Sequence, residues 1–171
     1  MNHARNASSS AKRKQIAAAN WKMNLTLEQG EKLLTAIIAG SSLTNDNQQA
    51  VFAVPFPYLA MAQQKIAGKK NVFIAAQNCS NKKNGAYTGE VSVEMLKSLG
   101  IRYVVLGHSE RREYFSESNQ LLAEKLNICL ENEMLPIFCC GEPLEIREAG
   151  TQNDFVAKQL QESLYHLSAD Q

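Results

Sequence analysis

Short continuous runs of apolar residues alternate along the chain with longer stretches in which apolar residues recur every three or four positions. The continuous runs lie at 15–19, 50–54, 71–77, 103–106 and 135–140. Runs of this length are typical of strands that are covered on both faces, as in a parallel sheet. The helical spacing lies at 26–40, 57–67, 91–99, 117–131 and 153–167. Five such alternations predict an α/β fold in which crossover helices cover a parallel sheet.

The first predicted helix carries signals at both of its ends. Thr26 and Gln29 are three residues apart, which is the spacing of a capping box at a helix start. Gly40 suits the other end, because glycine readily adopts the left-handed conformation that ends many helices. Further along, the polar stretch at 78–89 has no such periodicity and predicts a long loop after the third strand.

Composition and charge disfavour several classes of protein. Of the 171 residues, 44 % are hydrophobic and 20 % are charged, which predicts a soluble globular protein. The net charge of +1 gives no reason to expect nucleic acid as a partner, and no apolar run approaches the length of a membrane span. The GxGxxG fingerprint and the GxxxxGK phosphate loop do not occur, so no motif supports a nucleotide-binding fold.

The first 14 residues differ in charge from the rest of the chain. They carry four basic residues and no acidic one, whereas residues 15–171 carry 14 basic and 17 acidic residues, for a net charge of −3. Because this segment is serine-rich and lacks the apolar core of a secretory signal, we expect a basic disordered extension over 1–14 rather than a targeting segment. A module that binds an anionic surface is a weaker alternative, since four charges without aromatic residues favour it little.

The four cysteines, Cys79, Cys129, Cys139 and Cys140, show neither a CxxC pair nor the spacing of metal ligands. Three of them follow or lie in apolar stretches that are predicted to be strand or helix. Unpaired cysteines in such stretches are usually buried and behave as small apolar residues. We therefore expect reduced, mostly buried thiols in a cytoplasmic protein, and no metal site.

Polar residues gather directly after most of the predicted strands. They are, in chain order, Asn20 and Lys22, Gln77 and Asn78, His108 to Glu110, and Gly141 and Glu142. Because the carboxyl ends of parallel strands lie on one side of the sheet, this placement is how a barrel builds an active site. The adjacent residues His108, Ser109 and Glu110 do not indicate a hydrolase, because neighbours in sequence cannot easily converge as a catalytic triad.

Four segments carry a resemblance to one family. They are Ala18-Ala19-Asn20-Trp21-Lys22-Met23-Asn24, Gly85-Ala86-Tyr87-Thr88-Gly89-Glu90-Val91-Ser92, Leu106-Gly107-His108-Ser109-Glu110-Arg111-Arg112 and Phe138-Cys139-Cys140-Gly141-Glu142. In this order and spacing they resemble the first loop, the dimer-forming loop, the electrophile motif and the fifth strand end of triosephosphate isomerases. The resemblance covers the chain from about Ile16 to its last residue, and the barrel domain is assigned to 15–171. It implies the TIM (β/α)8 barrel family, here as an incomplete barrel domain with about the first five βα units.

The resemblance implies an isomerase of glycolysis and gluconeogenesis. Such an enzyme interconverts dihydroxyacetone phosphate and glyceraldehyde 3-phosphate through an enediolate, with triose phosphate as the substrate and without a cofactor or a metal. It also implies a cytoplasmic homodimer, in which the segment Tyr87-Thr88-Gly89 inserts into the partner subunit beside that subunit's active site. The alternative for this segment is a loosely held glycine-containing loop.

The resemblance also assigns roles to residues at the strand ends. His108 is expected to polarise the substrate carbonyl as a neutral imidazole, since a short helix directly after it would disfavour a second proton. Lys22 is expected to place a positive charge beside the phosphate and the enediolate, and Asn20 to donate a hydrogen bond to the substrate. Glu110 is expected to orient Lys22, and Gln77 to be structural. The residue types alone leave open a packing or surface histidine, a surface lysine, a turn asparagine and a helix-start acid.

One part of the family's machinery has no counterpart in the sequence. The family's general base is a glutamate after the sixth strand, in a motif resembling Tyr-Glu-Pro-Val-Trp-Ala, and no such stretch occurs among the 171 residues. The chain is therefore expected to be a fragment that is inactive alone. The alternative is a non-catalytic remnant that binds a phosphate compound or a full-length partner. Since five strands cannot close a barrel, the first and fifth strands are expected to be open edges and the chain to be prone to aggregation.

Overall fold

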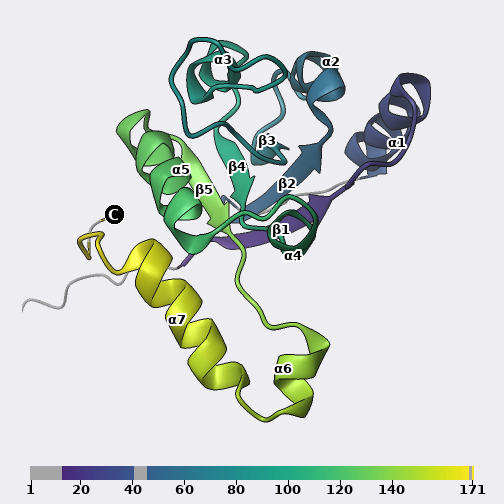
Figure 1. Ribbon diagram of the computed structural model, residues 1–171. Helices are drawn as coiled ribbons and strands as arrows, with labels where there is room; N and C mark the ends of the chain where they lie inside the picture. The colour runs from purple at the N-terminus through teal and green to yellow at the C-terminus, as the bar shows by residue number, and fades with distance from the viewer. Residues whose placement is uncertain (1–12, 41–45, 170) are drawn as a thin grey trace, which may run out of the picture.

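The computed structural model describes residues 13–40, 46–169 and 171. Strands and helices alternate in it as the sequence pattern predicts (Figure 1). The elements are β1 (Gln15–Asn20), α1 (Leu27–Gly40), β2 (Gln48–Val54), the 3-10 turn η1 (Phe56–Tyr58), α2 (Leu59–Lys65), β3 (Val72–Ala76), α3 (Val93–Ser98), β4 (Tyr103–Leu106), α4 (Ser109–Tyr114), α5 (Asn119–Glu131), β5 (Leu135–Phe138), α6 (Leu144–Glu148) and α7 (Gln152–Leu164). Of the predicted basic extension over 1–14, all but the last two residues lie outside the described residues.

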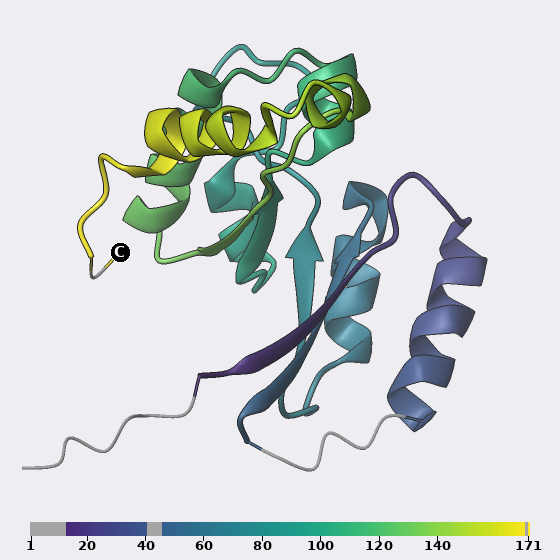
Figure 2. The same ribbon diagram turned by 90° about the horizontal axis from the view of Figure 1, so that it is seen from below.

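The strands of the described residues form one parallel sheet. Its order is β1-β2-β3-β4-β5, so each strand pairs with the strand that precedes it in the chain. Helices α1, α2, α3 and α5 lie around the outer side of this curved sheet (Figures 1 and 2). Sequential parallel strands with helices outside are the arrangement of a (β/α) barrel, here a half-barrel. The predicted fold class is confirmed.

The central strands face two separate apolar cores. Because side chains alternate along a strand, Val54, Ile74 and Val104 pack outward against the helices, whereas their neighbours point inward. The inward cluster consists of Val51, Ala53, Ala75, Tyr103 and Val105. Both sets are almost fully buried, which explains why β2, β3 and β4 appear in the sequence as continuous apolar runs.

Local signals place the starts of the main helices. Thr26 N donates to Gln29 Oε1 at 2.9 Å, and Gln29 N donates back to Thr26 Oγ1 at 3.4 Å, so the predicted capping box is confirmed. Ser118 caps α5 in a similar way, by accepting a hydrogen bond from Leu121 N at 3.1 Å. Helix α6, of five residues, was not predicted, because a single turn is too short to show a helical period.

The outermost strands correct one expectation and confirm another. The sequence predicts a buried first strand, but all six residues of β1 are exposed, with Ile16 at 47 %. The reason is position: among the described residues, β1 pairs with β2 alone and lies at one end of the sheet. Strand β5 lies at the other end, where Leu135 is 40 % exposed. The prediction that these two strands are open edges is therefore confirmed for the described residues.

The cysteines are free thiols, but fewer are buried than the sequence predicts. Cys79 and Cys129 are buried, Cys139 is half-buried and Cys140 is exposed. The apolar run that suggested burial ends earlier than predicted, because β5 stops at Phe138 and the two adjacent cysteines follow it in a loop. Among the described helices, none combines the length and the apolar character needed to cross a bilayer.

Candidate active site

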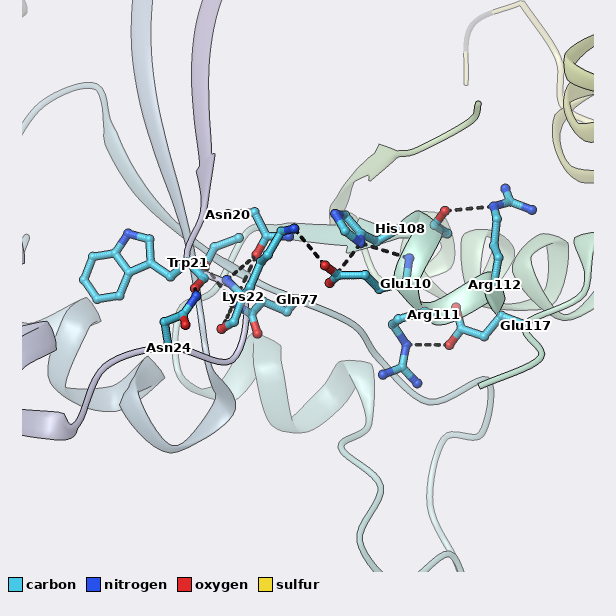
Figure 3. A network of polar contacts seen from close by, with 12 residues as sticks. Asn20, Trp21, Lys22, Asn24, Gln77, His108, Glu110, Arg111, Arg112 and Glu117 are labelled. Atoms are coloured by element: carbon cyan, nitrogen blue, oxygen red, sulfur yellow. Dashed lines mark hydrogen bonds and ion pairs between the residues drawn. The ribbon is translucent and has the colours of Figure 1, made fainter. Parts of the chain in front are cut away.

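Lys22 lies in the loop after β1 and has an unusual backbone conformation. Its φ of 54° falls in the left-handed region that residues other than glycine rarely adopt. The side-chain amide of Gln77, which follows β3, donates to Lys22 O at 2.9 Å and to Asn20 Oδ1 at 3.2 Å. Asn20 Oδ1 also accepts a hydrogen bond from Lys22 N at 2.9 Å. These bonds hold the loop in a strained shape, in which the lysine side chain points toward the end of β4 (Figure 3).

Trp21 anchors the same loop from its other side. The residue is 9 % exposed, and its ring packs against Gly30 of α1, where an added Cβ would lie 3.2 Å from the ring. Asn24 Nδ2 donates to Trp21 O at 3.0 Å. The loop is thus fixed between α1 and β3, so the position of Lys22 does not depend on its exposed side chain alone.

His108 links β4 to α4 and occupies the N-cap position of that helix. Its Nδ1 accepts a hydrogen bond from Glu110 N at 3.3 Å. Because a ring nitrogen that accepts a hydrogen bond carries no proton, the neutral imidazole holds its hydrogen on Nε2. Glu110 Oε2 lies 3.4 Å from the same Nδ1, where an acceptor would favour the opposite tautomer, but the backbone N–H of Glu110 is the group that has hydrogen-bonding geometry with this nitrogen. In this tautomer the Nε2–H group is the remaining donor of the ring.

Lys22 and Glu110 form an ion pair although they are 88 residues apart in sequence. Lys22 Nζ lies 2.7 Å from Glu110 Oε1, and the two side chains are 51 % and 41 % exposed. The hydrogen bond from Lys22, together with the positive charge of that lysine, holds the pKa of Glu110 below its usual value. The pair brings an ammonium group to the side of the sheet where His108 also lies (Figure 3).

Arg112 of α4 holds the end of β4, next to His108, against the end of β5. It donates from Nε to Gly107 O at 2.8 Å, from Nη2 to Cys139 O at 3.0 Å and from Nη1 to Asn119 Oδ1 at 2.7 Å. One guanidinium thus joins the ends of β4 and β5 to the start of α5. Gly107 has a φ of +74°, and an added Cβ would lie 2.9 Å from Arg112 Nη2 and 3.0 Å from Leu122 Cδ1. The residue before His108 must therefore be glycine for both conformational and steric reasons.

A buried charge network holds α4 against α5. Glu117 Oε1 accepts hydrogen bonds from Arg111 Nε at 2.8 Å and from Lys125 Nζ at 2.6 Å. Lys125 also donates to Asn78 Oδ1 at 2.9 Å. The side chains of Glu117 and Lys125 are only 2 % and 5 % exposed. Burial alone would raise the pKa of Glu117, but the hydrogen bonds from Lys125 and Arg111 outweigh burial and hold that pKa below its usual value.

The segment Tyr87-Thr88-Gly89, predicted to form a dimer contact, is exposed at the tip of a loop over 78–92, with Tyr87 at 47 %. This loop has ordered contacts with α5. Asn81 Nδ2 donates to Glu124 Oε2 at 2.6 Å, and Lys83 Nζ lies 3.3 Å from Glu131 Oε2. These contacts argue against a loosely held loop where the loop lies beside α5.

A cavity of about 770 Å³ opens beside His108, between α4 and the loop after β5. Its lining includes Arg112, Glu113, Cys140 and Glu142. The volume falls within the usual range for a small-ligand site. Within the described ranges, no group of three or more His, Cys, Asp or Glu side chains could hold a metal ion.

The structure brings together the residues that the sequence assigned to the site. Lys22, Asn20 and Gln77 meet in one hydrogen-bonded group, and Glu110 connects that group to His108. Their catalytic roles stay predictions. Sequence reasoning missed Arg112 and the network around Glu117. One signal was available for the latter, since Lys125 falls on the apolar stripe of the helix predicted over 117–131, where a lysine needs a partner.

Known proteins resemble most of this chain. The family model described as "Triosephosphate isomerase" matches residues 15–171. The triosephosphate isomerase of Cytophaga hutchinsonii is 49 % identical over 162 residues, which are 92 % of this chain and 62 % of that protein. The triosephosphate isomerase of Phocaeicola vulgatus is 46 % identical over 158 residues, with the same two shares. That of Porphyromonas gingivalis strain W83 is 45 % identical over 155 residues, 91 % of this chain and 61 % of that protein. The chain thus spans about three fifths of the length of these relatives.

Proposed function

Because this chain belongs to the triosephosphate isomerase family, we propose that it serves the interconversion of dihydroxyacetone phosphate and glyceraldehyde 3-phosphate. One observation carries the proposal. Lys22 and His108, which follow different strands, both contact Glu110, so a cation and a neutral hydrogen-bond donor lie at the same end of the sheet. Isomerisation through an enediolate needs such a pair, because negative charge develops on a carbonyl oxygen while the phosphate stays anionic.

His108 acts on the carbonyl in this proposal. The hydrogen on Nε2 can be donated to the substrate oxygen, and the bond strengthens as that oxygen becomes an enediolate. Lys22 offers a half-exposed ammonium group that interacts with the phosphate and with the same developing charge. The oxygen of Asn20 accepts hydrogen bonds from Lys22 and Gln77, so the amide nitrogen remains as its donor toward substrate.

The general base is proposed to come from outside these residues. The glutamate motif that the family resemblance calls for does not occur in the sequence, and the chain spans about three fifths of its relatives. The chain alone is therefore proposed to bind triose phosphate without turning it over at rates typical of the family. Proton abstraction by a positioned base contributes about 10²–10⁴ to the rate of such reactions.

The proposal includes the cytoplasmic setting and the homodimer of a glycolytic and gluconeogenic isomerase. The dimer contact is assigned to Tyr87-Thr88-Gly89, whose exposure leaves it available to a second subunit. The four free thiols are compatible with a reducing compartment. A second candidate function is a non-catalytic protein that binds a phosphate compound, which the cation at Lys22 would also favour.

Binding and turnover test the proposal separately. We expect dihydroxyacetone phosphate to shift the NMR signals of the His108 ring in the full chain, and Lys22→Met to weaken binding about tenfold or more. Lys32→Met is the matched control, because Lys32 pairs with Glu28 on the exposed face of α1 and should not affect binding. Unchanged binding in Lys22→Met would refute the assignment of the site.

An isomerase assay and the coding sequence distinguish the two candidate functions. The chain alone should show no turnover above that of His108→Ala, whereas turnover at rates typical of the family would refute the need for an external base. The DNA beyond codon 171 should encode, in frame, a strand followed by the base glutamate if the protein is an isomerase. A stop codon at that point would favour the non-catalytic protein.

A further inference from the structure

Two buried thiols face each other away from the candidate active site. Cys79, at the start of the 78–92 loop, and Cys129 of α5 have their sulfur atoms 3.6 Å apart. Both side chains are 0 % exposed, and the residues are 50 positions apart in sequence. Neither belongs to the hydrogen-bonded group around Lys22 and His108, so the proposed isomerase chemistry leaves the pair unexplained.

The surroundings of the pair make Cys129 the thiol that ionises more readily. The hydrogen bond from Cys79 lowers the pKa of Cys129, and the positive charge of nearby Lys125 lowers it further, although burial opposes both effects. The same hydrogen bond raises the pKa of Cys79, because it stabilises the protonated form of that thiol. Lys125 is itself fixed by Glu117 and Asn78, so its charge is held in place.

We propose that Cys79 and Cys129 are a modification site, at which a peroxide converts the two thiols into an intramolecular disulfide. The sulfur atoms must approach by only about 1.5 Å to reach bonding distance. Such a movement lies within the reach of side-chain rotation in a loop residue and a helix residue. The bond would tie the base of the 78–92 loop covalently to α5.

The reaction balances in two steps. The thiolate sulfur of Cys129 attacks one oxygen of hydrogen peroxide, the O–O bond breaks, and a sulfenic acid and hydroxide form. The sulfur of Cys79 then attacks the sulfenic sulfur, loses its proton, and displaces hydroxide, which leaves as water. Two thiols are oxidised, one peroxide is reduced, and two molecules of water are produced. A thiol reductant reverses the change.

Burial determines the order in which peroxide reaches the cysteines. Cys140 is exposed, so peroxide reaches it first, whereas the buried pair reacts only when the 78–92 loop opens. An exposed thiol can also join two chains together. For this reason the Cys140→Ser variant is the right background for the test, because it removes the exposed thiol and leaves the buried pair intact.

The test treats the 171-residue Cys140→Ser chain with about one equivalent of hydrogen peroxide, which reacts with thiolates before it reacts with methionine side chains, and measures its mass. We expect a monomer about 2 Da lighter, from the loss of two hydrogens, which recovers its original mass under dithiothreitol. Cleavage with trypsin and with a protease that cuts after glutamate separates Cys129 from Cys139 at Glu131. The oxidised digest should contain the peptide with Cys79 joined to the peptide with Cys129.

Two further variants and one alternative outcome complete the test. Cys129→Ser and Cys79→Ser, each combined with Cys140→Ser, should not lose the two hydrogens. The proposal is overturned if Cys79 and Cys129 still react with a thiol reagent after oxidation and unfolding. It is also overturned if the disulfide joins either residue to Cys139, or if both sulfurs are found only as sulfinic or sulfonic acids.

Discussion

Glu117 is predicted to be the residue whose replacement most weakens the junction between α4 and α5. The variant Glu117→Gln keeps the shape of the side chain and an acceptor oxygen, but it removes the negative charge that faces two cations. Lys125 would then remain buried, at 5 % exposure, with hydrogen bonds and no countercharge. Arg111 suffers less, because its side chain is 28 % exposed and reaches water.

The expected loss of stability follows from the burial of Lys125 and Glu117. Removing one partner of a buried ion pair costs about 3–5 kcal/mol. Glutamine still accepts a hydrogen bond from Lys125, so we expect the lower part of that range and below, about 2–4 kcal/mol. Since about 1.36 kcal/mol is a factor of ten, the equilibrium for opening α5 should rise about 30- to 900-fold.

Native-state hydrogen exchange of the α5 backbone amides measures this change directly, because protection reports the free energy of opening. The matched control is Glu124→Gln on the same helix, where Glu124 contacts Asn81 and Lys82 at the exposed surface. Surface pairs contribute about 0–1 kcal/mol, so the control should exchange at most about fivefold faster. If Glu117→Gln exchanges no faster than Glu124→Gln, the reasoning is refuted.

Acid gives a second readout of the same carboxylate. A carboxyl whose pKa is lowered by folding contributes stability that is fully present above its unfolded-state pKa, here 4.5, and lost as the pH falls through the folded-state value. The protection that separates the native chain from Glu117→Gln should therefore be constant near neutral pH and should shrink below pH 4.5. A difference that stays constant in acid would show that charge is not its cause.

Two further predictions concern the strand ends and the sheet edges. Gly107→Ala should lower the free energy of unfolding by about 2 kcal/mol or more, because the backbone has a positive φ there and an added Cβ would make close contacts. The control Gly150→Ala, at φ +72° with nothing within 4 Å of the added Cβ, should show only the smaller conformational cost, and equal shifts in the melting temperature would contradict this. Because β1 is an open edge, the chain alone should associate as its concentration rises, as measured by sedimentation. Ile16→Lys should reduce this association, and a monomer that melts cooperatively at all concentrations would argue against an exposed edge that drives association.

The parts that sequence could predict are those that depend on local periodicity. The alternation of strands and helices, the capping box at Thr26 and the gathering of polar residues after the strands all follow from short stretches of sequence. The exposure of β1 does not, because burial depends on which elements lie beside a strand rather than on its own residues. For the same reason the early end of β5, and with it the exposure of Cys140, could not be seen in an apolar run.

For the site, too, short stretches of sequence could indicate the residues but not the long-range contacts that position them. The resemblance named Lys22 and His108, but the φ of 54° at Lys22 is supported in part by Gln77, which lies after β3 and is far from Lys22 in sequence. Likewise, Arg112 joins Gly107, Asn119 and Cys139 only after the fold brings those residues together. Long-range hydrogen bonds of this kind leave no periodic trace in the chain.

The two charge groups that include a residue of α4 differ in a way that suits different tasks. The network at Glu117 is joined to two helices and the 78–92 loop, and moving either Glu117 or Lys125 would leave a desolvated charge without its partner. The pair between Lys22 and Glu110 is half-exposed, and such pairs contribute little to stability. The first can therefore fix the position of α4 and of His108, while the second is free to break when an anionic ligand attracts Lys22. A site that binds an anionic ligand and stabilises negative charge as it develops needs a fixed framework, here the network at Glu117, together with a cation that can move, here Lys22.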